Sequence, residues 1–208
     1  MLVSPYKNVD QYSRIRVPPH QLNSDIRNNI KLILKKNLEK KCNKNGFIEE
    51  IFKIIDFEDG ELYPENLSGS VMFDIKFHCR LCLPIENTII VSKVVIINQE
   101  LVVATNGPIF IFIPKENIDK NNWKIFDNNL INKKSDKELK INDFVKVMIS
   151  NKKVNKDDWQ IKAIGILNDF ATKKEIENFY GTIIEEKSEE KSEENENDNI
   201  NDDDNFII

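Results

Sequence analysis

The stretch 69-GSVMFDIKFHCRLCLP-84 alternates between apolar and polar residues for most of its length. Every odd position from Val71 to Leu83 is apolar, whereas the even positions are mostly polar or charged. Because successive side chains of a β-strand point to opposite faces of the sheet, this alternation predicts one long strand, 69–83, with one buried face. Pro84 ends the strand, since proline has no amide hydrogen to donate to a sheet.

The same stretch contains a Cys-x-x-Cys spacing, Cys79 and Cys82, directly after His78. In intracellular proteins this spacing can mark a zinc site or a redox pair. Within one strand, however, the two cysteines point to opposite faces with Cα atoms about 10 Å apart, beyond the ~7 Å limit of a disulfide. His78 and Cys82 share a face about 13 Å apart, and a zinc ion needs about four ligands, for which only Cys42 and His20 remain as candidates. We therefore expect no metal and no cofactor, with Cys79 in the core and Cys82 on the opposite face of the sheet.

The composition is that of a soluble globular protein: 208 residues, 40% hydrophobic and 31% charged. The N-terminus has no apolar signal segment, and the longest apolar run, Ile109–Ile113, is too short to span a bilayer. With three cysteines and no secretory signal, we expect an intracellular protein with reduced thiols and no membrane partner.

Charge is unevenly distributed along the chain, whose formal net charge is −5. Residues 185–204 carry eleven Asp or Glu and two Lys, a balance of −9, which leaves +4 for the rest. The tail 182–208 is acidic and poor in apolar residues, so it is predicted to be disordered. A mildly basic body with an acidic tail is compatible with nucleic-acid binding but does not require it.

Hydrophobic periodicity predicts a helix at 24–41, preceded by an irregular extension, 1–12, and a short strand at 13–17. The segment 47–57 fits either a helix or a strand, and its β-branched and aromatic content favours a strand only slightly. Further strands are expected at 88–98, 100–105, 109–113, 144–150 and 159–167, with a short helix at 172–180. Five short strands with one long connection between the third and the fourth are typical of a small OB-type barrel. The fold class is therefore α+β and mostly β.

Phe110 and Phe112 alternate with isoleucines on the third of these five strands, so one of the two sets fills the interior. The other set can form a platform for base stacking, as OB-folds do. The alternative is that the phenylalanines belong to the core or pack on a partner. Trp123 and Trp159 are expected to be packing residues.

The turn 151–158 between the last two strands carries Lys152, Lys153 and Lys156, which can contact phosphates. A solvated loop is the commoner role of such lysines. The sequence has no Gly-rich phosphate loop, no GxSxG and no HExxH motif, and its two histidines support no nucleophile–base pair. We therefore expect a protein without catalytic residues; a zinc or thiol enzyme built on Cys79 and Cys82 is the disfavoured alternative.

In order and spacing, these segments resemble the stalk subunit of multisubunit RNA polymerases, the family of the seventh subunit of RNA polymerase II and the archaeal E subunit. The resemblance covers about 13–180. It is carried by 13-SRIRVPPHQL-22, 46-GFIEEIFKIIDFEDGELYPENLSGSVMFDIKFHCRLCLP-84, 107-GPIFIFIPKENI-118, 139-LKINDFVKVMI-149 and 161-IKAIGIL-167.

The chain departs from the family pattern in places. It reads 85-IENTII-90 where a Gly-Glu pair is usual, and Asn142 stands where a glycine is common. These departures put the local turn geometry in question more than the fold. A divergent version encoded by a large DNA virus would account for them and for the Asn-, Ile- and Lys-rich composition.

The resemblance implies that 47–57 is a strand and that a helix covers an antiparallel sheet in an N-terminal tip domain, 13–84. It further implies a C-terminal OB-fold barrel at 85–181, flanked by the extension 1–12 and the tail 182–208. The family docks its tip domain on the polymerase core, and the matching loop residues here are Asp59, Gly60, Leu62, Tyr63 and Pro64.

The resemblance also implies a non-catalytic subunit of a DNA-directed RNA polymerase. Its partners would be the largest subunit and clamp region of the core, a small helical partner of the fourth-subunit type, and the nascent RNA. The location would be the nucleus for a cellular eukaryotic polymerase, and a cytoplasmic viral factory or the virion for a viral one. The RNA-binding candidates are Phe110, Phe112, Lys152, Lys153 and Lys156. The alternative function is a free-standing OB-fold RNA-binding protein, such as a translation factor.

Overall fold

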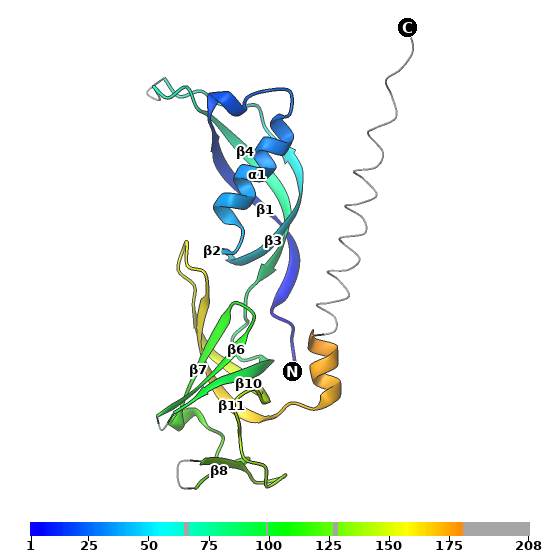
Figure 1. Ribbon diagram of the computed structural model, residues 1–208, viewed down its shortest axis with the longest axis vertical. Helices are drawn as coiled ribbons and strands as arrows, with labels where there is room; N and C mark the ends of the chain where they lie inside the picture. The colour runs from blue at the N-terminus through cyan, green and yellow to red at the C-terminus, as the bar shows by residue number, and fades with distance from the viewer. Residues whose placement is uncertain (65–66, 99, 127–128, 181–208) are drawn as a thin grey trace.

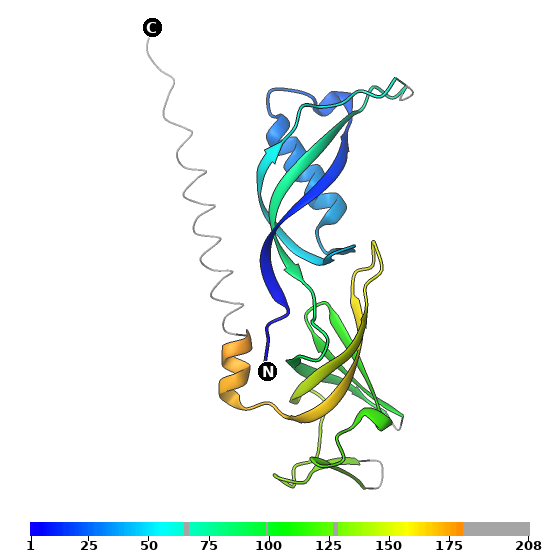
Figure 2. The ribbon, with the colours of Figure 1, turned by 180° about the vertical axis from the view of Figure 1, so that it is seen from behind.

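The structure is a computed structural model that describes residues 1–64, 67–98, 100–126 and 129–180 (Figure 1). The predicted disordered tail, 182–208, lies outside the described residues. The molecule is elongated: a sheet covered by one helix lies at one end and a β-barrel at the other, as both ribbon views show (Figures 1 and 2).

The sheet has four antiparallel strands in the order β1-β4-β3-β2: β1 (Tyr6–Val17), β4 (Val71–Cys82), β3 (Gly46–Phe57) and β2 (Lys41–Asn43). The long strand predicted at 69–83 and the strand preferred for 47–57 are both confirmed. The irregular chain predicted over 1–12 is wrong from Tyr6 onward, because β1 pairs with β4 along its whole length, from Tyr6 opposite Cys82 to Val17 opposite Val71. The polar residues of 6–12 carry little strand signal themselves, and the ladder offered by β4 sets their conformation.

Helix α1 (Ile26–Leu38) crosses one face of this sheet (Figure 1). Its Ile30 and Leu34 are fully buried against the odd-numbered face of β4, which is the face that the alternation predicted to be buried. The helix is shorter at both ends than the predicted 24–41. It stops because Glu39 is extended and Lys40 adopts a left-handed φ of 60°. A short 3-10 helix, η1 (Pro19–Gln21), precedes it.

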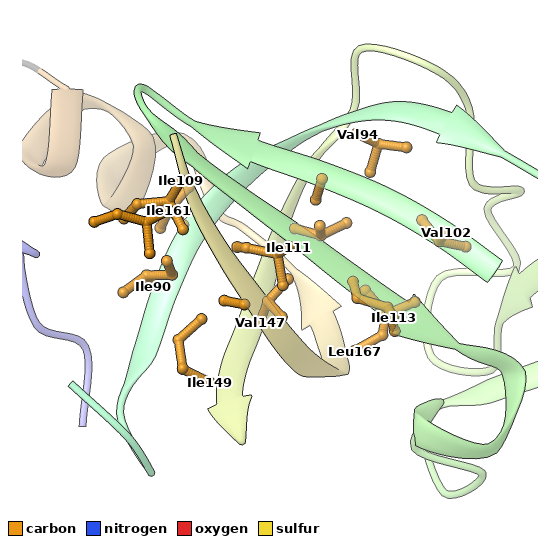
Figure 3. Close-up of a cluster of buried hydrophobic side chains, with 14 of the residues drawn as sticks. Ile90, Val94, Val102, Ile109, Ile111, Ile113, Val147, Ile149, Ile161 and Leu167 are labelled. Atoms are coloured by element: carbon orange, nitrogen blue, oxygen red, sulfur yellow. The ribbon is translucent and has the colours of Figure 1, made fainter. Parts of the chain in front are cut away.

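The barrel is closed by five strands in the order β10-β11-β7-β6-β5, and β11 pairs with β7 in parallel. These strands are β5 (Ile89–Ile97), β6 (Leu101–Asn106), β7 (Ile109–Pro114), β10 (Phe144–Lys153) and β11 (Ile161–Phe170). Each lies where the sequence predicted a strand. The interior is filled by aliphatic side chains from all five strands (Figure 3), among them Ile90, Val94, Val102, Ile109, Ile111, Ile113, Val147, Ile149, Ile161 and Leu167.

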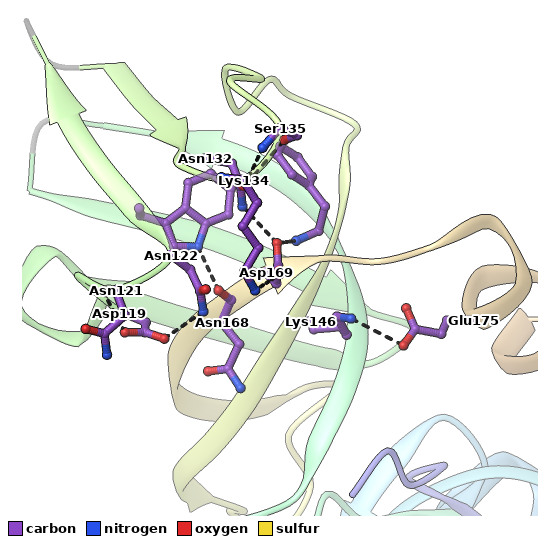
Figure 4. A network of polar contacts seen from close by, with 12 residues as sticks. Asp119, Asn121, Asn122, Asn132, Lys134, Ser135, Lys146, Asn168, Asp169 and Glu175 are labelled. Carbon is purple, nitrogen blue, oxygen red and sulfur yellow. Dashed lines mark hydrogen bonds and ion pairs between the residues drawn. The ribbon is translucent and has the colours of Figure 1, made fainter.

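The long connection between β7 and β10 has structure that the sequence did not predict. It contains a 3-10 turn, η2 (Lys115–Asn117), and a two-stranded sheet of β8 (Trp123–Phe126) and β9 (Asn129–Asn132). A polar network ties it to the end of β11 (Figure 4). Asp169 accepts hydrogen bonds from Asn132 Nδ2 at 2.8 Å and Lys134 Nζ at 3.0 Å, and the indole of Trp123 donates to Asn168 O at 3.0 Å. Trp123 is buried, which confirms its predicted packing role.

A turn and a helix complete the barrel. Asn142, where the resembled family commonly has glycine, has a left-handed φ of 75°, a conformation that asparagine tolerates better than most residues. The closing helix spans 173–180. Thr172 and Glu175 exchange hydrogen bonds at its start in a capping box, and its Phe179 is buried against the barrel.

Backbone hydrogen bonds hold the sheet and the barrel together beside Pro84. Cys42 of the edge strand β2 donates to Asp158 O at 2.7 Å and accepts from Asp157 N at 2.8 Å, so the β10–β11 loop lies against β2. The segment before β1 also bonds to the barrel: Val3 N donates to Ile89 O of β5 at 3.0 Å, and Ile89 N donates to Met1 O at 3.1 Å. One buried cluster runs across this junction and joins Cys42, Phe47 and Cys82 to the barrel interior.

Candidate nucleic-acid interface

The outer surface of β7 carries the two phenylalanines singled out in the sequence. Ile109, Ile111 and Ile113 point into the barrel and are fully buried. Phe110 and Phe112 therefore point outward, and Phe112 is 36% exposed. The two phenylalanines thus lie on the face of β7 where a nucleic acid base can reach an aromatic ring.

The first row of outward side chains joins an aromatic ring to two lysines. Phe110 lies opposite Lys162 of β11, and Lys162 in turn lies opposite Lys153 of β10. Both lysines are exposed. Cations at this spacing beside an aromatic platform suit the phosphates and bases of a single strand.

The second row is apolar at its centre. Phe112 lies opposite Ile164, which is 44% exposed, and Ile164 lies opposite Asn151. Together the rows form a groove of about 440 Å³, called here the barrel groove. Its lining residues are Phe112, Asn151, Lys152, Lys153, Lys162, Ala163 and Ile164.

The three predicted lysines have different positions. Lys153 lies in the barrel groove. Lys152 also lines it, but its Nζ donates a hydrogen bond to Pro84 O at 2.8 Å, so its ammonium ties β10 to the junction with the sheet. Lys156 is exposed in the β10–β11 loop. Lys162 was not among the predicted residues, although the alternation of 161-IKAIGIL-167 places it with Ile164 on the outer face.

Trp159 does not pack, contrary to its predicted role. It is 82% exposed in the β10–β11 loop. The backbone of this loop is fixed by its hydrogen bonds to Cys42, which hold the loop in place without burying the indole. An exposed indole in a fixed loop next to Lys156 is a second surface on which a base could stack.

The predicted docking residues lie at the far end of the molecule from the barrel, in the loop between β3 and β4 (Figure 1). These are Asp59, Gly60, Leu62, Tyr63 and Pro64, all exposed. The Tyr63 hydroxyl accepts from Arg14 Nη1 at 3.1 Å and donates to Glu61 at 2.8 Å. Arg14 also pairs with Asp74, and hydrogen bonding to it holds the pKa of that carboxyl below its usual range. Leu62 is 65% exposed in this loop, and the hydrogen bond of Tyr63 to Arg14 fixes the loop to the sheet.

The three cysteines lie inside the protein and not on its surface. All three are buried as free thiols, Cys79 in the sheet core and Cys82 on the opposite face, as predicted. Burial raises the pKa of Cys42 to about 11 and that of Cys79 to about 12, so both stay protonated near neutral pH. Over the ranges that the structure describes, no three His, Cys, Asp or Glu side chains gather where they could hold a metal ion.

By its fold the chain belongs to the α+β class of proteins: it is mostly β and contains a closed five-stranded barrel. No protein-family profile matches the chain. The chain is 28% identical over 166 residues to a protein of Acanthamoeba polyphaga mimivirus that is named as a candidate DNA-directed RNA polymerase subunit. The match covers 80% of this chain and 83% of the mimivirus protein. It confirms the predicted resemblance at the level of a polymerase subunit of a large DNA virus. None of the described helices is long and apolar enough to cross a membrane.

Proposed function

We propose that this chain is a non-catalytic, stalk-type subunit of a DNA-directed RNA polymerase and that its barrel binds the emerging transcript. The similarity to the mimivirus protein along 80% of the chain carries the polymerase part. The barrel groove, with its exposed aromatic and aliphatic side chains beside lysines, supports the RNA part. The free-standing RNA-binding alternative is not favoured by that similarity.

The arrangement of the strands supports an OB-fold. β7 and β11 close the barrel in parallel, and the long connection falls between the third and fourth strands. OB-folds bind oligonucleotides on the face of their second and third strands and on the loops joining strands one to two and four to five. In this barrel the second and third strands are β6 and β7, and the loop joining strands four to five is the β10–β11 loop. Phe112 lies on β7, whereas Lys156 and Trp159 lie in that loop.

We assign different proposed partners to the two ends of the molecule. In the proposal, residues 13–84 form the tip domain, whose β3–β4 loop docks on the largest subunit and clamp region. A small helical fourth-subunit-like partner covers further apolar surface. The transcript lies along the barrel, residues 85–181, in the viral factory or virion of a viral polymerase.

Docking is tested by replacing Leu62 with aspartate. A tagged wild-type chain expressed in infected source cells is expected to recover the large polymerase subunits. Leu62→Asp is expected to recover about tenfold less, because a charge in a desolvated anchor position opposes binding. Leu32→Asp is the matched control, since Leu32 on α1 is 66% exposed and Leu62 is 65% exposed. Recovery of the wild-type chain alone would overturn the polymerase assignment, and equal recovery by both variants would remove the docking role of the loop.

RNA binding is tested by reversing two groove charges. We expect Lys153→Glu with Lys162→Glu to weaken the binding of a single-stranded RNA by at least about tenfold. The slope of log K against log salt should flatten by about 1.4, since each lost phosphate contact removes about 0.7. Lys173→Glu with Lys174→Glu, on the closing helix, changes the net charge equally without touching the groove. If both pairs weaken binding alike, the effect is net charge alone and the groove is not the site.

A further inference from the structure

The second half of α1, β2 and the turns on either side of β2 carry a basic surface that the proposed function does not use. Residues 31–44 contain six lysines and a single acidic residue, Glu39. Lys36, Lys40 and Lys44 are exposed. A positively charged surface formed by fourteen consecutive residues attracts a polyanion.

This surface lies next to the β10–β11 loop although the two are far apart in sequence. Cys42 exchanges two backbone hydrogen bonds with the loop, at Asp157 and Asp158. Lys41 directly precedes Cys42, and Lys156 directly precedes Asp157. The backbone segments that carry the lysines of the sheet end and those of the barrel end therefore lie side by side, since the ribbon shows the β10–β11 loop beside β2 (Figure 2).

The β10–β11 loop lies between the two basic surfaces and contributes Lys156 to the route. It connects β10 to β11 between Lys153 and Lys162, which lie opposite each other at the end of the barrel groove. Trp159, 82% exposed, lies in the same loop. Two acids lie along this route: Asp157 is exposed, and Asp158 accepts a hydrogen bond from Asn155 at 2.9 Å. Lysines outnumber acidic residues on both sides of the loop, in the barrel groove and in residues 31–44.

We propose that single-stranded RNA leaving the barrel groove continues over the β10–β11 loop and onto the surface formed by the end of α1 and the turns on either side of β2, where Lys36, Lys40 and Lys44 contact its phosphates. This inference rests on the proposed RNA-binding function and extends it from one domain to two. Charge complementarity and continuity with the groove favour a nucleic-acid strand as the occupant. Phosphate contacts of this kind add affinity without adding sequence preference.

Oligonucleotides of two lengths distinguish the two parts of the proposed RNA path, the barrel groove and the lysines near α1. A strand of roughly five nucleotides is near the lower end of OB-fold site sizes and fits the groove alone, whereas one of roughly fifteen nucleotides reaches α1. Neutralising the helix surface with Lys36→Gln, Lys40→Gln and Lys44→Gln is expected to weaken the long oligonucleotide at least about tenfold and to flatten its salt slope by about 2. Binding of the short oligonucleotide should not change.

The control replaces three exposed lysines off the proposed RNA path, Lys7, Lys53 and Lys174, with glutamine in the full chain. Fluorescence anisotropy with both oligonucleotides is the measurement. Equal affinity of the helix variant and the wild type for the long strand would overturn the inference, as would equal losses for both lengths. Failure of the wild type to bind the short strand would instead overturn the groove. A chain ending at residue 180 adds a third arm: a gain in long-strand affinity that the helix variant lacks would support the inference, because it would mean that RNA and the acidic tail compete for these lysines.

Discussion

Replacing Arg80 with alanine is expected to lower the free energy of unfolding by about 3–5 kcal/mol, the cost of breaking a buried ion pair by removing one partner. Arg80 is 1% exposed, and its Nε lies 3.2 Å from Glu49 Oε2, on a side chain that is 12% exposed. The guanidinium also lies over the ring of Tyr6, 5.2 Å from its centroid. The variant leaves the Glu49 carboxylate buried without the charge that offsets its lost hydration, and it removes the cation over Tyr6.

A second variant separates the pair from the packing around it. Replacing Arg80 with methionine and Glu49 with leucine together removes both charges and keeps most of the volume, a change that is often neutral or stabilising by about 1–4 kcal/mol. Urea denaturation followed by circular dichroism measures both variants. A loss below about 1 kcal/mol in Arg80→Ala, as is typical of exposed pairs, would mean that Glu49 is solvated by water and that the pair adds little.

Arg80 also marks where the sequence stops predicting the structure. The alternation of 69–83 predicted which face of β4 is buried, and Arg80, at an even position, belongs to the other face. At this end of the strand both faces are buried, because Cys82 packs against the barrel interior and the ring of Tyr6 lies over Arg80 on the second one. That cover comes from residues distant in the sequence, so no local pattern signals it.

The contrast between local pattern and contacts made by distant residues also explains the other differences between the predicted and the observed structure. The barrel strands have strong apolar periods and were predicted near their true positions. β8 and β9 have only four residues each, too few to show a clear period, and their place depends on bonds to Asn168 and Asp169 that only the folded chain brings within reach. The exposure of Trp159 depends on the pairing of its loop with β2, which is likewise a tertiary effect.

The candidate site was predictable in part. Alternation on 109–113 separated the isoleucines from Phe110 and Phe112, although composition alone left open which set points inward. Lys153 was among the predicted candidates for phosphate contact, but its neighbour Lys162 was not, because their proximity depends on the register between β10 and β11. Strand register is fixed by the closed barrel as a whole, so it follows from the fold and not from either strand alone.

Shortening Ile111 to alanine is expected to cost about 2–5 kcal/mol of unfolding free energy, the usual range for removing an aliphatic side chain from a core. Ile111 is fully buried at the centre of the barrel (Figure 3), and its neighbours across the strands are the small residues Ala104 and Ala163. A Cβ added at Gly165 would lie 2.8 Å from Ile111 Cγ2. One large side chain thus occupies space left by three small residues, and none of the three is long enough to fill the cavity.

Ile111→Val is the matched control, with an expected loss of about 0.5–1.5 kcal/mol, and thermal denaturation followed by circular dichroism ranks the two variants. Both keep Phe110 and Phe112 on the outer face. Where the alanine variant is still folded, its RNA affinity should therefore stay near that of the wild type. Similar losses of stability for valine and alanine would mean that the barrel collapses around the cavity. A large loss of RNA affinity in the folded alanine variant would mean that the groove depends on the exact filling of the interior, because the phenylalanines and Ile111 share one strand.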